Sequence, residues 1–291
     1  MILLAITVFS IMSGLVKALD RVPAGQVVFF RSAFALPVIV FWLWSQGDLQ
    51  NGLKTRNYRS HFFRSVAGTI AMGLGFAGLK YLPLPEVTAL GFVMPILIVI
   101  FAALFLGEKI RLVRISAVLL GLIGVLIILW PRLGAGISGA GQPEMIGAMM
   151  VLAGAGFAAT AQIFIKGMAG QEKTAAIVFY FTLTSMIVST TSLPFGWVWP
   201  TETELAMLSG VGLVGGIGQI LLTSSYRFAD ASALAPFGYT SMIWALLIGY
   251  FVFDEVPTLM TISGAGLVIL SGIAIVLRER HLAMKSSNLA R

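Results

Sequence analysis

Long apolar runs separated by short polar stretches organise this sequence. A helix needs about 20 mostly apolar residues to cross roughly 30 Å of hydrocarbon. Ten runs meet that requirement, at residues 2–19, 24–45, 61–80, 86–106, 112–130, 145–167, 174–195, 204–227, 232–253 and 258–277. The pattern therefore predicts an all-α integral membrane protein with ten transmembrane helices.

The composition supports this membrane assignment. Of the 291 residues, 58% are hydrophobic and 11% are charged, whereas soluble domains carry about 25% charged residues. The net charge of +7 does not indicate a nucleic acid partner, because the basic residues lie between the apolar runs rather than along one face. Membrane lipid is the expected surrounding. The sequence has no cysteine, which excludes disulfides and thiolate metal sites.

The positions of lysine and arginine predict the orientation, because these residues favour the cytoplasmic ends of helices. With a cytoplasmic N-terminus, the inside segments hold fourteen of them, Arg64 among these, and the outside segments hold four. Arg31 lies within a span and is not counted. The bias predicts a multi-pass protein of the bacterial inner membrane with both termini in the cytoplasm.

An internal repeat divides the chain into two halves. Residues 80–108 align without gaps on residues 227–255 at an offset of 147, and the matched pairs include Phe92 with Tyr239. Each half holds five spans, which is an odd number, so the second copy is expected to cross the bilayer upside down. Two inverted five-helix repeats with a site at their interface are typical of secondary transporters.

These residues also carry a resemblance to a known family. The stretches ASALAPFGY at 231–239 and WALLIGYFVFDE at 244–255 resemble the ninth helix of the EamA type of the drug/metabolite transporter superfamily. The first half has similar segments, EVTAL at 86–90 with FLGE at 105–108, and VFFR at 28–31 is similar to the family's second helix. The resemblance extends over about residues 2–277.

The resemblance implies two EamA repeats that transport by alternating access. They would occupy residues 1–130 and 145–280, with a periplasmic linker at 131–144 and a cytoplasmic tail at 281–291. It further implies a central cavity lined mainly by the first four helices of each repeat. Such carriers take amino acids, nucleotide-like metabolites, vitamins and drugs, so the family does not select a substrate.

Several polar and aromatic residues within or near the spans are candidates for the substrate pathway. An intramembrane arginine such as Arg31 indicates function, although it could instead reach the interface or pair with Glu86. In the middle of spans, Trp244 and Tyr239 could form an aromatic wall or pack between helices. The full set is Ser13, Lys17, Arg31, Gln162, Lys166, Tyr180, Gln219, Tyr239 and Trp244.

Alternatives stay open for the charged residues at span ends. Lys17 and Lys166 end the first helix of each repeat, where they would serve as interface anchors or as donors to a solute. Ser13 and Gln162 lie one turn before them on the same face. Glu108 and Glu255 end spans four and nine, and they are interpreted as structural groups that cap or pair at the interface with neighbours such as Lys109 or Arg111.

The spans lack the groups that an enzyme or a metal- or cofactor-dependent protein would need. The middle third of each span has no aspartate or glutamate, and no catalytic cluster, metal motif or cofactor motif is present. We therefore expect a transporter rather than an enzyme, and we expect no cofactor. A membrane-embedded enzyme that modifies lipid and a passive channel are the two alternatives. The partner would be a neutral or anionic small-molecule substrate such as riboflavin or an amino-acid-like or nucleoside-like solute. The sequence leaves open whether the protein forms a homodimer.

Overall fold

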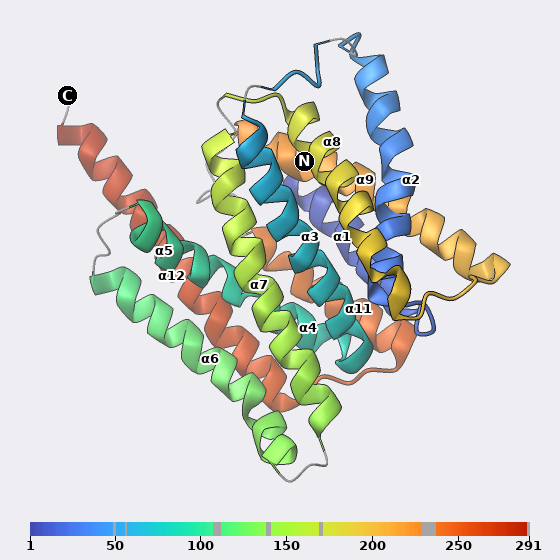
Figure 1. Ribbon diagram of the computed structural model, residues 1–291. Coiled ribbons are helices and arrows are strands. Elements are labelled where there is room, and N and C mark those ends of the chain that lie inside the picture. The colour runs from blue at the N-terminus through green and yellow to red at the C-terminus, as the bar shows by residue number, and fades with distance from the viewer. Residues whose placement is uncertain are drawn as a thin grey trace.

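Helices make up every regular element in the part of the chain that the structure describes. The computed structural model describes residues 1–48, 51–55, 57–106, 112–137, 141–168, 171–228 and 237–289. Figure 1 shows a bundle in which helices from the two ends of the chain pack against one another. The elements, in chain order, are α1 Ile2–Lys17, α2 Ala24–Ser45, α3 Tyr58–Tyr81, α4 Leu84–Gly91, α5 Val93–Leu106, α6 Leu112–Ile137, α7 Gln142–Met168, α8 Thr174–Ser189, η1 Thr190–Phe195, α9 Glu202–Phe228, α11 Thr240–Phe253 and α12 Leu259–Leu289.

Five of the described helical segments are long and apolar enough to cross a membrane. These are Ala24–Ser45, Tyr58–Tyr81, Gln142–Met168, Thr174–Phe195 and Glu202–Phe228. Shorter apolar helices are Ile2–Lys17, Leu84–Ile98, Leu119–Pro131, Thr240–Phe253 and Leu259–Ser271. The fold is therefore the all-helical membrane fold that the hydropathy predicts.

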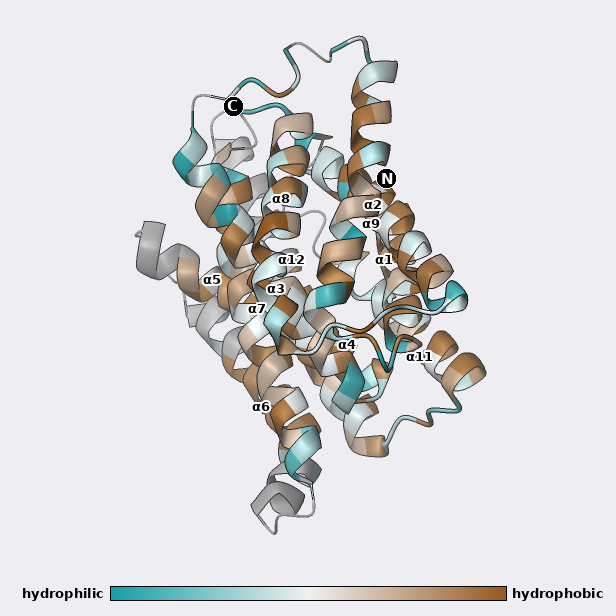
Figure 2. Ribbon diagram, turned by 45° about the vertical axis from the view of Figure 1, so that its right-hand side comes forward, coloured by the Kyte–Doolittle hydropathy of each residue, from teal (hydrophilic) through white to brown (hydrophobic). Residues whose placement is uncertain are grey.

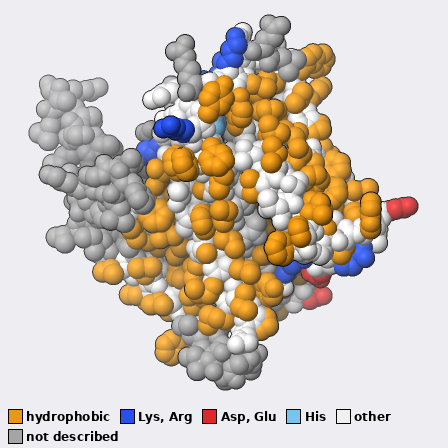
Figure 3. Space-filling view, viewed as in Figure 1, with side chains coloured by type: hydrophobic (Ala, Val, Ile, Leu, Met, Phe, Trp, Pro, Cys, Tyr) orange, Lys and Arg blue, Asp and Glu red, His pale blue; other side chains and the backbone are white. Residues whose placement is uncertain are grey.

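The outer surface of the bundle is apolar, as lipid requires. Many large hydrophobic side chains are exposed, among them Phe41, Ile123, Trp130, Phe251 and Leu270. In Figure 3 hydrophobic side chains cover the middle of the visible face, whereas lysines and arginines lie near its upper edge and charged groups of both signs at its lower right. Figure 2 shows the same contrast, with hydrophilic residues concentrated toward the ends of the helices.

The fourth apolar segment is broken into two helices at Phe92, where α4 ends before α5 begins. Pro95 accounts for this break. Its nitrogen has no hydrogen to donate to the carbonyl of Gly91, and its ring crowds that carbonyl. The aligned residue Tyr239 is the N-cap of α11, so a second interruption falls at the equivalent position. Pro236 lies outside the described residues.

Helices extend into the predicted linker and the predicted tail. In the predicted linker 131–144, α6 continues through Pro131 to Ile137 and α7 begins at Gln142. A proline within a helix frees one backbone carbonyl, but helical backbone on either side keeps the other groups paired. Similarly, α12 continues to Leu289 through most of the predicted tail 281–291.

Small residues bring α2 and α9 close together. A Cβ atom on Gly212 would collide with Phe34, and one on Gly216 would lie 3.2 Å from the Cα of Ala35. Gly212 and Gly216 form a GxxxG pair of the kind that packs membrane helices. Because α2 belongs to the first half of the chain and α9 to the second, this contact joins the two halves.

A second close contact joins α6 and α12 at one side of the bundle (Figure 1). A Cβ on Gly124 would lie 2.7 Å from the carbonyl oxygen of Gly264, and one on Gly264 would lie 2.5 Å from that of Gly124. These two helices therefore pack backbone against backbone. The site described next lies between α2, α3, α8 and α9.

Candidate functional site

Arg31 is the largest of the almost completely buried side chains in the described structure, and only 1% of it is exposed. Its Nη2 donates to the carbonyl oxygen of Gly215 on α9 at 3.2 Å, while Nε and Nη1 have no hydrogen-bond partner. The guanidinium carbon lies 5.5 Å from the centroid of the Phe181 ring. Arg31 therefore points inward between helices, and neither the interface position nor the pairing with Glu86 is realised.

Arg64 on α3 faces the same ring. Its guanidinium carbon lies 3.7 Å from the centroid of Phe181, and the residue is 3% exposed. Nε and Nη1 of Arg64 also have no hydrogen-bond partner. Phe181, on α8, is itself 4% exposed. Two arginine cations thus share one buried aromatic ring, an arrangement that cation–π attraction favours.

The two arginines approach this ring from opposite ends of the bundle. Each lies about 10 Å along its helix from the first residue at 1.5 Å per residue, and α2 and α3 run in opposite directions (Figure 1). Their guanidinium groups nevertheless meet at the same ring. The first half of the chain supplies Arg31 and Arg64, while the second half supplies Phe181 and Gly215, so the site lies between the halves.

Buried hydroxyl groups surround the arginines along the same helices. The Oγ1 of Thr69 on α3 lies 2.7 Å from the Oγ of Ser185 on α8, which links these helices. Ser32, Ser65 and Thr182 have buried hydroxyls that lack a partner. Unpartnered buried polar groups are unusual and mark a site that needs explanation.

Two glycines leave room for the guanidinium groups. A Cβ on Gly215 would lie 2.9 Å from Nε of Arg31, and one on Gly68 would lie 3.3 Å from Nη1 of Arg64 and 2.8 Å from the Phe181 ring. Any larger residue at these positions would displace the arginines or the ring. The helix backbones are therefore shaped to hold the guanidinium–aromatic cluster of Arg31, Arg64 and Phe181.

Lys17 forms a largely buried ion pair near one end of the bundle. Its Nζ lies 2.8 Å from Oε1 of Glu255 and donates to the carbonyl oxygens of Leu79 and Leu82. The other oxygen of Glu255 accepts from the backbone N–H of Leu84 at 2.8 Å, at the start of α4. Glu255 therefore caps and pairs as the sequence indicates, but its partner is Lys17 from the other half. Glu108, Lys109 and Arg111 lie outside the described residues.

The other residues predicted near the helix-one ends have separate environments. Ser13 donates to the carbonyl oxygen of Phe9 in its own helix. Gln162 is half-buried on α7. Lys166 is exposed in the last turn of α7. The structure does not bring Ser13, Gln162 and Lys166 together with the guanidinium–aromatic cluster.

Tyr180 and Gln219 also form local contacts. The hydroxyl of Tyr180 donates to the carbonyl oxygen of Leu53 at 3.1 Å, and its ring centroid lies 5.0 Å from that of His61. Tyr180 therefore sits near the loop before α3. Gln219 on α9 is buried and donates to Thr223 at 3.3 Å. The first bond joins a helix to a loop, and the second lies within one helix.

The two aromatic candidates are placed differently. Tyr239 contacts Phe92 edge to face, with the ring centroids 5.2 Å apart, and packs against the apolar cluster that holds Phe92 and Met242. Trp244 is half-buried on α11. Among the described residues no ring contact joins Tyr239 to Trp244, since five positions along a helix place them on different faces.

Two residues of the site, Arg64 and Phe181, were not among the sequence candidates, and Arg64 is the charged one. The charge count treats it as part of the loop before the third span, but it lies inside α3 and is buried. Its removal from that count leaves thirteen basic residues on the inside against four. The sequence does carry a signal, because Arg64 lies three residues inside the predicted span 61–80, just as Arg31 lies inside the span 24–45.

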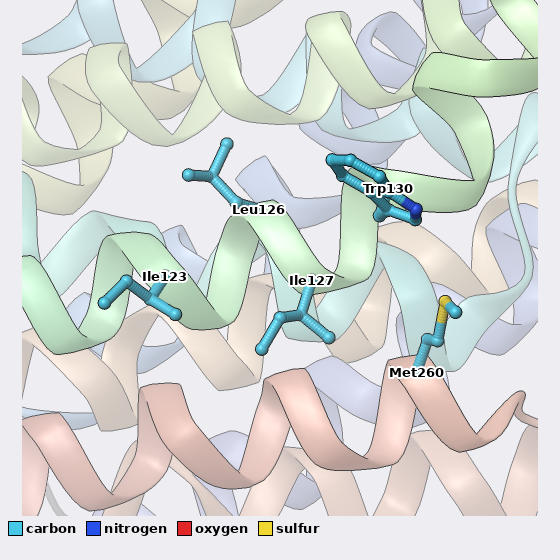
Figure 4. A pocket seen from close by; sticks show the side chains of 5 residues that line it. All are labelled: Ile123, Leu126, Ile127, Trp130 and Met260. Carbon is cyan, nitrogen blue, oxygen red and sulfur yellow. The ribbon is translucent and has the colours of Figure 1, made fainter.

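The grooves on the outer surface are not part of this site. One, of about 300 Å³, lies between α6 and α12 and is lined by Ile123, Leu126, Ile127, Trp130 and Met260 (Figure 4). Another, of about 470 Å³, is lined by Tyr58, Arg59, Phe62 and Phe63. Both have predominantly apolar walls that suit lipid chains. Among the described residues, no group of three or more histidine or acidic side chains could hold a metal ion.

Exposed ion pairs join the loops of the two halves at both ends of the bundle. Arg21, before α2, lies 2.6 Å from Glu204 in the first turn of α9. The hydrogen bond and the charge of Glu204 raise the pKa of Arg21. Lys173, before α8, lies 2.6 Å from Asp48, which follows α2. These contacts hold the halves together outside the apolar zone.

A polytopic helical bundle with a buried cationic site between its halves is typical of membrane transport proteins. The sequence profile of the EamA-like transporter family matches residues 1–130 and 145–278. The chain belongs to the EamA-like transporter family, with two copies of its repeat. It is thus a transmembrane protein of the drug/metabolite transporter type.

Relatives of similar length carry transporter names. The chain is 30% identical over 277 residues to the pseudopaline exporter of Pseudomonas aeruginosa strain UCBPP-PA14, which covers 94% of this chain and 93% of that protein. It is 29% identical over 265 residues to the S-adenosylmethionine uptake transporter of Rickettsia bellii strain RML369-C, covering 91% and 88%. These similarities support a small-molecule transporter.

The fold also has a counterpart among solved structures. A protein crystal structure superposes with a TM-score of 0.66 at 20% sequence identity, over 95% of this chain and 98% of the other. At that identity the likeness concerns the fold alone.

Proposed function

We propose that this protein is a secondary transporter that moves a small organic metabolite across the bacterial inner membrane by alternating access. The observation that supports this most directly is the guanidinium–aromatic cluster between the two halves, which side chains of α2, α3 and α8 form. A polar site at the interface of two repeats can be exposed to one side and then to the other when the halves rock against each other.

The proposal includes ten spans in two inverted repeats, with both termini in the cytoplasm. The ten apolar helical segments and the paired interruptions at Phe92 and Tyr239 support this arrangement. The domain limits would follow the family match at 1–130 and 145–278. No enzymatic step is part of the proposal.

The relatives provide the first solutes to test. One relative is named for pseudopaline and another for S-adenosylmethionine, and their names indicate opposite directions of transport. Riboflavin is the aromatic metabolite that we add from the sequence. The set of nine pathway candidates remains part of the proposal, together with Arg64 and Phe181.

The test is reconstitution of the purified protein into liposomes, with radiolabelled S-adenosylmethionine, pseudopaline and riboflavin as separate solutes. We expect the liposomes to take up one of these solutes in exchange for a counter-solute inside them. This uptake should saturate with solute concentration and should need no ATP. Protein-free liposomes and liposomes that contain an unrelated membrane protein are the controls. Linear, unsaturated flux would identify a channel, and an absence of protein-dependent flux for every solute would contradict the assignment.

A further inference from the structure

We propose that Arg31 and Arg64 jointly bind an oxyanion, a carboxylate or a phosphate group, of the transported solute beside the ring of Phe181. This inference rests on the proposed transport function and specifies the chemical class of its substrate. The two arginines come from different helices, are 1% and 3% exposed, and lie 5.5 and 3.7 Å from the same ring centroid.

The first argument is the number of unused hydrogen-bond donors. Nε and Nη1 of both arginines are buried without an acceptor, and Arg31 makes one bond, from Nη2 to Gly215. A guanidinium carries five N–H donors in a fixed fork that fits a carboxylate or phosphate bidentately. A ligand oxyanion would therefore satisfy donors that this protein leaves unpaired.

The second argument is charge. Each ion pair between described residues involves other cations: Lys17, Arg21, His61 and Lys173. Arg31 and Arg64 thus form two neighbouring positive charges without a carboxylate partner in the described structure. Like charges repel strongly where the dielectric constant is low, and an intramembrane charge is normally paired. A negatively charged solute group between them would reverse an unfavourable interaction.

The third argument is shape. Gly68 and Gly215 lie where a Cβ would come within 3.3 Å of Nη1 of Arg64 and 2.9 Å of Nε of Arg31. Glycine at these positions therefore lets the helix backbones approach the guanidinium groups, where a larger residue would collide with them. Phe181 holds the two planes from the second half of the chain. The alternative is a purely structural role, in which the arginines join helices through this ring. The experiments below distinguish that role from ligand binding.

Binding can be measured without transport. The probes are succinate, inorganic phosphate and the uncharged analogue succinamide, added to detergent-solubilised protein at constant ionic strength while its thermal unfolding is followed. We expect saturable stabilisation by succinate or phosphate and none by succinamide. The effective oxyanion distinguishes a carboxylate site from a phosphate site. If neither oxyanion raises the unfolding temperature above the sodium chloride reference, the proposal is overturned.

Variants then assign the effect to the two arginines. In Arg31→Gln and Arg64→Gln the oxyanion stabilisation should disappear, whereas Arg59→Gln, which alters an exposed arginine of α3, should retain it. Stabilisation that survives both substitutions would overturn the proposal. Without ligand, Arg64→Gln should unfold at the same or a higher temperature, because a buried unpaired charge is removed. A lower temperature, with no loss of ligand response, would indicate a structural fastener.

Arg31→Lys and Arg64→Lys provide a second pair in case the glutamine variants do not fold. Lysine keeps the charge but loses the fork, so we expect at least a tenfold rise in the probe concentration that gives half of the stabilisation. Transport separates the two levels of inference. If the protein carries an uncharged solute and neither arginine variant changes that flux, the transporter assignment stands and the oxyanion site is eliminated. An absence of flux would contradict the transporter, while the binding test still decides this site.

Discussion

The rings of Phe92 and Tyr239 meet edge to face, with centroids 5.2 Å apart and an interplanar angle of 78°. The two residues are aligned by the internal repeat, at an offset of 147. Each also lies at an interruption, Phe92 between α4 and α5 and Tyr239 before α11. The contact thus joins the two repeats at equivalent points, where the helical hydrogen bonds are already weakened and bending is easiest.

Pro95 offers a test of this bending. In Pro95→Ala the new N–H can bond the carbonyl of Gly91, so α4 and α5 can join into one helix, in whose interior a proline would cost about 3 kcal/mol. We expect a higher thermal unfolding temperature and a transport rate lowered several-fold. Initial rates in liposomes and thermal unfolding in detergent check the two effects. Pro23→Ala, just before α2, should change neither. An unchanged transport rate in Pro95→Ala would show that the break is not used for movement.

The Lys17–Glu255 pair should contribute strongly to stability. Its side chains are 13% and 15% exposed, and breaking a mostly buried pair by removing one partner costs about 3–5 kcal/mol. We expect Lys17→Gln to lower the free energy of unfolding in detergent by an amount toward the low end of that range. Adding Glu255→Gln should cost less than the sum of the single changes.

The matched comparison for this cycle is the exposed pair of Lys173 and Asp48, whose side chains are 49% and 36% exposed. Exposed pairs contribute about 0–1 kcal/mol, so Lys173→Gln should have little effect. Equal losses at the two sites would mean that burial does not determine the strength of these pairs.

Trp244 tests the proposed pathway away from the arginines. Trp244→Ala should raise the solute concentration at half-maximal transport by roughly twofold to twelvefold, as expected for loss of an aromatic contact of about 0.5–1.5 kcal/mol. Expression should remain intact because the side chain is half-buried. Trp44→Ala, at a residue that is 63% exposed near the end of α2, is the control. Identical kinetics for wild type and Trp244→Ala would remove Trp244 from the pathway.

The topology can be tested directly because the chain has no cysteine. Lys54→Cys lies in the loop between α2 and α3, and Trp199→Cys lies between η1 and α9. With inverted repeats and a cytoplasmic N-terminus, a membrane-impermeant maleimide should label Cys at 199 in intact cells and Cys at 54 only after the membrane is opened. Labelling of both from the same side would contradict the inverted arrangement.

The sequence predicted the positions of the apolar helices well, because a run of about 20 apolar residues in lipid has no alternative to helix. The GxxxG spacing of Gly212 and Gly216 in the sequence also favours the close helix packing that the structure shows. It did not predict the partner of Glu255, because Lys17 is distant in sequence and the pairing depends on how the halves dock. Arg64 was missed because charge counting places basic residues near span ends in loops. Its burial against Phe181 depends on the tertiary packing of α3 on α8.

The backbone contact between α6 and α12 constrains how this protein can change shape. At Gly124 and Gly264 neither helix leaves space for even one methyl group of the other. Two helices seated this closely cannot slide or roll without first separating. They should therefore behave as one rigid body, and conformational change would be confined to the eight other apolar segments.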